Sequence, residues 1–73
     1  MATATSMTCV EQIGETAGEV WRLLESDGPL ALTKLVKEID APRDVIMQAV
    51  GWLAREDKVW IEEEGRARVL HLR

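Results

Sequence analysis

Several residue types that mark particular protein classes are scarce in this 73-residue chain. It has one cysteine, Cys9, and one histidine, His71, so it cannot form an internal disulfide, and these two residues cannot complete a zinc site. No apolar run approaches the ~20 residues that a membrane-spanning helix needs. We therefore expect no metal, no cofactor and no membrane partner. The single cysteine fits a reducing compartment, and we expect a cytoplasmic protein.

The residue patterns of catalysis are scarce as well. An active site needs convergent groups such as a nucleophile beside a base, a phosphate-binding loop or a metal cluster, and the sequence offers none of these patterns. The run Glu62–Glu64 precedes a glycine on an expected hairpin, where carboxylates are solvated. We therefore expect no enzyme and no small-molecule substrate.

The composition is otherwise that of one small globular domain, with 47% hydrophobic and 30% charged residues. Its first eight residues, "MATATSMT", lack the basic start and apolar centre of a secretory signal. They are small and mostly polar, so we expect residues 1–8 to be a disordered lead. The domain should then span residues 9–73.

Hydrophobic periodicity predicts three helices. Apolar residues recur with helical spacing between Val10 and Ser26, and "SDGP" ends that segment, with Gly28 as a left-handed cap. A short strand at Leu30 and Leu32 should lead into a second helix that has Thr33 as its N-cap. The third helix should run from Pro42, at its first position, to about Glu56.

After Lys58 the hydrophobic period changes from 3.6 to 2, which predicts a β-hairpin around Gly65. A turn at Glu64 and Gly65 would place Ile61 opposite Arg68 and Trp60 opposite Val69. The order of elements predicts an α+β fold, a winged helix-turn-helix of three helices, a short strand and a C-terminal hairpin wing. Twelve in-phase apolar residues should form its core: Ile13, Ala17, Val20, Leu24, Leu35, Ile39, Ile46, Val50, Leu53, Val59, Ile61 and Leu70. Trp21 and Trp52 border these stripes and should be buried with them.

The segments "IGETAGEVWRLLE", "ALTKLVKEI" and "AVGWLARED" together resemble a family of small bacterial and archaeal winged helix-turn-helix proteins, catalogued as a domain of unknown function. The resemblance covers roughly residues 10–72. It implies a winged-helix fold and an association with DNA, and it carries over no catalytic residues.

Charge gives mixed support to DNA binding, which relies on a basic contact surface. The first helix carries five acids against one arginine, whereas the second and third are each neutral, and the wing holds three glutamates against Arg66 and Arg68. We expect these two arginines to pair with the neighbouring glutamates. Gln48 can read adenine and an arginine can read guanine. The candidate DNA-binding residues are Lys34, Lys37, Arg43, Gln48, Arg55, Lys58 and Arg66.

Other residues favour contact with a protein instead. Gly51 lies in a helix opposite the expected core stripe, so either it is simply tolerated or something approaches closely there, whether a nucleic-acid backbone or a partner. Gly14 and Gly18 stand four residues apart on the first helix, where they either let a neighbouring element come close or face a partner. Trp60 should lie on the exposed side of the ribbon, as interface anchors do. Two functions stay open. One is a DNA-binding regulator with weak electrostatic binding, and the other is a protein-interaction module that reuses the fold without DNA binding and contacts another protein or forms a weak homodimer.

Overall fold

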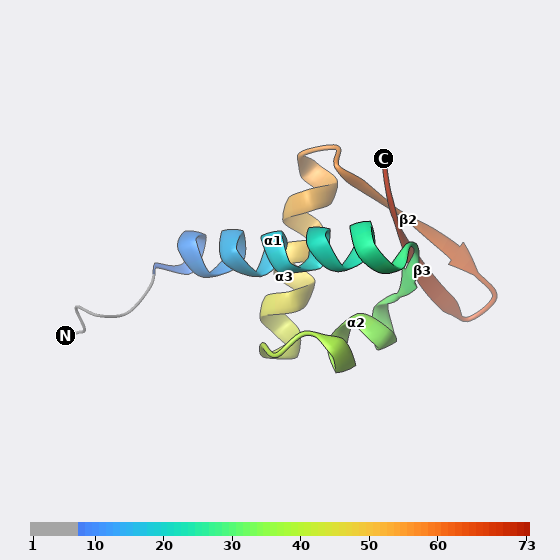
Figure 1. Ribbon diagram of the computed structural model, residues 1–73, viewed down its shortest axis with the longest axis horizontal. Helices are drawn as coiled ribbons and strands as arrows, with labels where there is room; N and C mark the ends of the chain where they lie inside the picture. Colours follow the sequence, from blue (N-terminus) through green and yellow to red (C-terminus); the bar gives the residue numbers. More distant parts are fainter. Residues whose placement is uncertain (1–7) are drawn as a thin grey trace.

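The computed structural model describes residues 8–73, and these form three helices and a three-stranded antiparallel sheet (Figure 1). The elements in chain order are α1 (Cys9–Asp27), β1 (Leu30–Ala31), α2 (Leu32–Glu38), α3 (Arg43–Arg55), β2 (Val59–Glu64) and β3 (Ala67–Leu72). The strands lie in the order β1-β3-β2, and β2 and β3 form the C-terminal hairpin. The predicted α+β winged helix-turn-helix architecture is therefore confirmed.

The start of α1 is fixed by a reciprocal capping box. The backbone N–H of Glu11 donates to the Thr8 hydroxyl at 3.1 Å, and the backbone N–H of Thr8 donates to the Glu11 carboxylate at 2.9 Å. This second hydrogen bond, helped by the Thr8 side chain, holds the pKa of the Glu11 carboxyl below its ordinary value. Thr8 is thus the N-cap of α1, which corrects its placement in a disordered lead. The rest of that predicted lead, residues 1–7, lies outside the described residues.

The connection from α1 to α2 is tighter than predicted. Gly28 ends α1 with a φ of 82° and a ψ of −163°, a backbone region open almost only to glycine, rather than in the left-handed helical conformation. The two residues of β1 pair with β3, and α2 begins at once with Leu32. Ala31 is therefore the N-cap of α2, and the prediction of Thr33 as N-cap was wrong.

The ends of α3 follow the local sequence closely. Pro42 is the N-cap rather than the first helical residue, and its carbonyl accepts from the N–H of Ile46. At the other end Asp57 adopts a positive φ of 62°, while the N–H of Lys58 donates to the carbonyl of Leu53 at 2.9 Å. This is the bonding pattern by which a left-handed residue closes a helix, and it directs the chain into β2.

The hairpin register differs from the predicted one. Glu64 pairs with Ala67, so the two-residue turn is Gly65–Arg66, with Gly65 at a φ of 62°. Glycine at the first central position suits a type II′ turn, whose twist matches that of the strands. Ile61 consequently lies opposite Leu70 instead of Arg68, and Trp60 lies opposite His71 instead of Val69.

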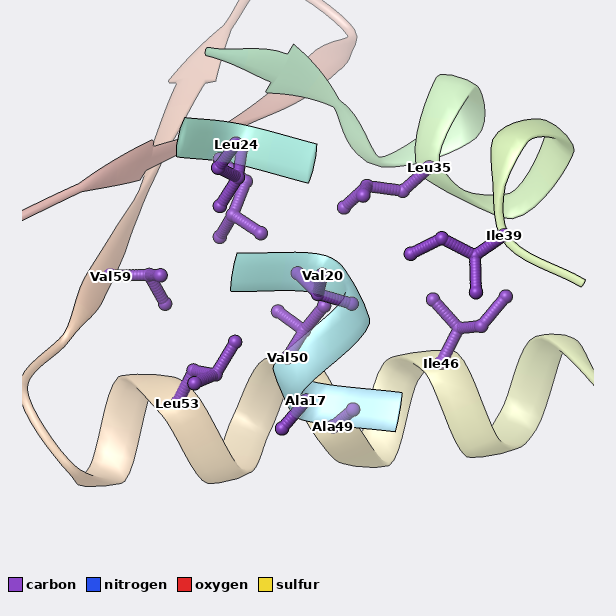
Figure 2. Close-up of a cluster of buried hydrophobic side chains, with 11 residues drawn as sticks. Ala17, Val20, Leu24, Leu35, Ile39, Ile46, Ala49, Val50, Leu53 and Val59 are labelled. Carbon is purple, nitrogen blue, oxygen red and sulfur yellow. The ribbon is translucent and has the colours of Figure 1, made fainter. Parts of the chain in front are cut away.

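The core lies where α1, α2, α3 and the inner face of the sheet meet (Figure 2). Ten of the twelve predicted core residues are buried, and the exceptions are Ile13, which is half-buried, and Ile61, which is 39% exposed. Trp21 and Trp52 are 36% and 43% exposed, so their predicted burial was wrong. The aliphatic side chains and Ala17 and Ala49 close the core between the helices, and both indoles remain at its border.

Candidate nucleic-acid interface

The helix-turn-helix consists of α2 and α3, joined by the short segment 39–42. The buried side of α3 is formed by Val45, Ile46, Ala49, Val50 and Leu53, which fixes its polar residues on the outside. Arg43, Asp44, Gln48 and Arg55 are exposed. The helix thus presents a mixed surface, in which Asp44 opposes the approach of phosphate near the first turn.

Gln48 and Arg55 lie on one shallow hollow of about 440 Å³, together with Gly51, Trp52, Glu56 and Ile13 of α1. Glu56 adds a carboxylate to this surface. A Cβ added at Gly51 would meet nothing within 4 Å, so no part of the described protein requires a glycine there. Base-reading chemistry is therefore present on α3, beside an acid that weakens the attraction for phosphate.

A second hollow, of about 430 Å³, lies between the start of α2, the start of α3 and the wing. We call it the arginine groove. Its lining consists of Ala31, Leu32, Thr33, Arg43, Arg66, Ala67 and Arg68. Among residues 8–73, three cations and no carboxylate therefore line this groove, in a chain whose net charge is −4. Such a local concentration of arginine is suited to binding phosphate, because guanidinium groups match phosphate oxygens in geometry and charge.

The ion pairs of the wing leave much of this charge accessible. Nε of Arg68 lies 3.5 Å from the Glu63 carboxylate, but both side chains are well exposed, so the pair is weak. Arg66 takes part in no ion pair among residues 8–73. The expectation that both arginines pair with wing glutamates is thus confirmed for Arg68 and wrong for Arg66. Arg68 was missed as a candidate, because its place beside Arg43 depends on the packing of α3 near the wing.

The remaining predicted cations do not share one surface. Lys34 and Lys37 are exposed on α2, where Lys34 directly follows the groove residue Thr33. Lys58 instead lines a wide hollow of about 790 Å³ between α1 and the end of α3. The structure therefore brings Arg43 and Arg66 together, and places Gln48, Arg55 and Lys58 on other surfaces.

The wide hollow also contains both glycines predicted to make a contact. We call it the tryptophan hollow, because Trp21 of α1 and Trp52 of α3 both line it, with Gly14, Ala17, Gly18, Arg22, Glu25, Leu53, Asp57, Lys58 and Arg73. A Cβ at Gly14 would meet nothing within 4 Å, and one at Gly18 would meet only the guanidinium of Arg22, at 3.4 Å. Within the described chain, neither glycine admits a neighbouring helix or strand.

Trp60 lies on the outer face of the sheet and is 41% exposed. Its indole stacks on the imidazole of His71, with ring centroids 4.4 Å apart and planes 12° apart. Nε2 of His71 lies 2.9 Å from a carboxylate oxygen of Glu62. Trp60 is therefore exposed as predicted, but it is partly supported by its own hairpin.

Residues 8–73 contain neither a cluster of metal ligands nor a membrane-spanning helix. Within residues 8–73, no three His, Cys, Asp or Glu side chains are grouped so that they could hold a metal ion. None of the helices in that range is long and apolar enough to cross a membrane.

Comparison with known proteins agrees with this architecture. Residues 7–72 match the family model described as "Winged helix-turn-helix domain (DUF2582)". The chain is also 35% identical over 65 residues to "Uncharacterized protein MJ1608" of Methanocaldococcus jannaschii, an alignment that covers 85% of this chain and 91% of the relative. No solved structure matches the chain.

Proposed function

The chain belongs to this winged helix-turn-helix family, and we propose that it binds double-stranded DNA weakly, through phosphate contacts made by the arginine groove. The observation that carries the proposal is the convergence of Arg43, Arg66 and Arg68 between the helix-turn-helix and the wing, with no acid in the lining. Lys34 and Lys37 add positive charge on the adjoining helix.

Low sequence specificity follows from the chemistry of α3. Gln48 and Arg55 carry groups that can read bases, but they lie beside Glu56 and away from the arginine groove. Phosphate contacts fix position and supply affinity, whereas base contacts supply specificity. The net charge of −4 further weakens long-range attraction to DNA. We infer a binding role without catalysis, in the cytoplasm, and related to transcription.

The salt dependence of binding tests this proposal quantitatively. Three to five phosphate contacts predict a slope of about −2.7 to −4.5 in log K against log salt, since each contact contributes roughly −0.9. Raising the salt from about 50 to 200 mM should therefore weaken binding about 40- to 500-fold. The measurement is fluorescence anisotropy of a labelled 20-bp duplex titrated with the full chain.

Matched variants identify the surface. Arg43→Ala and Arg66→Ala should each make the slope shallower by about 1 and weaken binding to unrelated duplexes equally. Lys58→Ala is the control, because it removes one positive charge from a different hollow. Binding that depends on Lys58 as strongly as on Arg43, or that prefers one duplex and persists at high salt, would contradict the proposal.

A protein-interaction role is the second candidate, and Trp60 favours it. An exposed indole on the outer face of the sheet, next to the acidic run Glu62–Glu64, is better suited to a protein than to DNA. If the folded wild-type chain shows no DNA binding even at low salt, the DNA proposal fails and this second role becomes the preferred one.

A further inference from the structure

We propose that the tryptophan hollow, together with the outer face of α1, is an interface with a second copy of this chain, in which the two α1 helices pack antiparallel. The proposal is independent of DNA binding. It starts from an exposed apolar surface: Trp21 and Trp52 are 36% and 43% exposed, and Val10 is 58% exposed on the same helix as Trp21. Figure 1 shows that α1 crosses α3 and that its first turns extend past that helix.

The shape of this face is self-complementary. Trp21 projects from α1 seven residues after Gly14, so the two lie on the same stripe of the helix. An antiparallel pair centred between Ala17 and Gly18 places Trp21 of each copy opposite Gly14 of the partner subunit. A two-fold axis makes that contact twice, as an isologous interface requires. The open space at Gly14, where an added Cβ would meet nothing within 4 Å, is then the space that the indole fills.

The charges on α1 favour the antiparallel arrangement over a parallel one. Glu11 and Glu15 precede the centre of the helix, and Arg22 follows it. At about 100° per residue these three side chains lie within roughly 40° of one another around the helix. In the antiparallel pair Arg22 stands level with the interval between the partner's Glu11 and the partner's Glu15, on the same side of the contact. In a parallel pair the two copies of this charged flank would lie on opposite sides of the contact, so Arg22 would not meet the partner's acids. Complementary charge of this kind selects orientation and register.

Arg22 is free to make such a contact. It takes part in no ion pair among residues 8–73, and its guanidinium lies over the open face of Gly18. A contact limited to one pair of helices with two indoles at its sides falls short of the ~1,200 Å² that stable complexes bury, so the dimer should be weak. Trp60 is the less suitable centre for self-association, since it already stacks on His71 and its strand continues into three glutamates.

Sedimentation equilibrium of the full chain, from about 10 µM to 1 mM, tests the proposal. Dimer should appear within this range and weaken as salt rises. Gly14→Leu should weaken association at least tenfold while leaving the monomer folded, because the added side chain meets open space in the monomer and leucine favours helix over glycine. The control is Ala54→Leu, which adds the same side chain at another exposed helical position, on α3.

Charge reversal then tests the orientation. Arg22→Glu and Glu15→Arg should each weaken the dimer, and the double variant should restore it, because both charges of the pair are exchanged in both copies. Loss of folding cannot mimic this rescue. A wild type that stays monomeric at 1 mM overturns the proposal. The proposal is also overturned if Gly14→Leu leaves the dimer unaffected or makes it tighter. It is likewise overturned if Trp60→Ala abolishes the dimer while Arg22→Glu does not.

Discussion

The hairpin register makes a sharp prediction about two side chains that face each other across one strand pair. Leu70 lies in β3 and is fully buried, while Ile61 lies opposite it in β2 and is 39% exposed. Both substitutions Leu70→Ala and Ile61→Ala remove three carbon atoms. The comparison therefore holds the chemistry and the strand pair constant and varies only burial.

The expected losses of stability differ by more than a factor of two. Removing three buried carbons at Leu70 costs about 2.4 kcal/mol of transfer free energy, and the cavity left under α1 raises the total to roughly 3–4 kcal/mol. At Ile61 much of the lost surface already contacts water and no closed cavity forms, so the cost should be about 1–1.5 kcal/mol.

Urea unfolding followed by tryptophan fluorescence and far-UV circular dichroism measures both free energies. In a domain of this size each kcal/mol also lowers the thermal midpoint by about 4–8 °C. Equal losses for the two variants, or a larger loss for Ile61→Ala, would refute the observed register and favour a shifted hairpin in which Ile61 is buried.

Three further predictions concern the start of α1 and the residues that precede it. Thr8→Ala should destabilise the domain by about 1 kcal/mol in the same unfolding assay, as the loss of an N-cap does, and an unchanged midpoint would show that the capping box carries no stability. Glu11→Gln keeps a hydrogen-bond acceptor but removes the charge. Because the pKa of Glu11 is lowered in the folded state, the wild type should be more stable than this variant above the ordinary glutamate pKa. This difference in stability should vanish as the pH falls through the lowered pKa. Removing residues 1–7 should leave the thermal midpoint within error, whereas removing Thr8 as well should lower it, and equal midpoints for the two truncations would argue against the cap.

The helices and most of the core could be predicted from the sequence because their signals are local. Leu24 belongs to the apolar stripe of α1, and Ile46 and Leu53 belong to the apolar stripe of α3. All three side chains are buried, as the helical period predicted. The turn after α3 was also readable, since Asp57 is one of the residue types that tolerate a positive φ.

The hairpin register could not be read from the same kind of pattern. Moving the turn from Glu64–Gly65 to Gly65–Arg66 shifts each cross-strand partner by two residues and leaves every side chain on the same face of its strand. Alternation of apolar and polar residues therefore fits both registers, and the conformation of Gly65 decides between them. The arginine groove was missed for a different reason: it joins Arg43 of α3 to Arg66 and Arg68 of the wing, and the packing of these distant segments leaves no local pattern in the sequence.

The exposed indoles depend on the placement of whole helices. Trp21 and Trp52 border apolar stripes, and a large apolar residue in such a position normally closes the core. Here aliphatic side chains and Ala17 and Ala49 fill the space where α1 crosses α3, so that the two indoles are left at its edge. Helical period gives the side of a helix on which a residue lies, but not how far the neighbouring helix extends over it.

The strand order β1-β3-β2 also has a consequence for how the chain reaches its native state. The central strand, β3, follows all the other described elements along the chain, and Leu30 of β1 has its partner Leu70 forty residues later. The helices can form early from local contacts, but the sheet lacks its central strand until residues 67–72 have left the ribosome. Translation proceeds at about 5–20 residues per second, so β1 is synthesised a few seconds before the strand β3 with which it pairs. Completion of the fold is thus tied to the synthesis of β3, and a nascent chain that stalls before this strand is made leaves the core residues that pack with Leu70 without their cover.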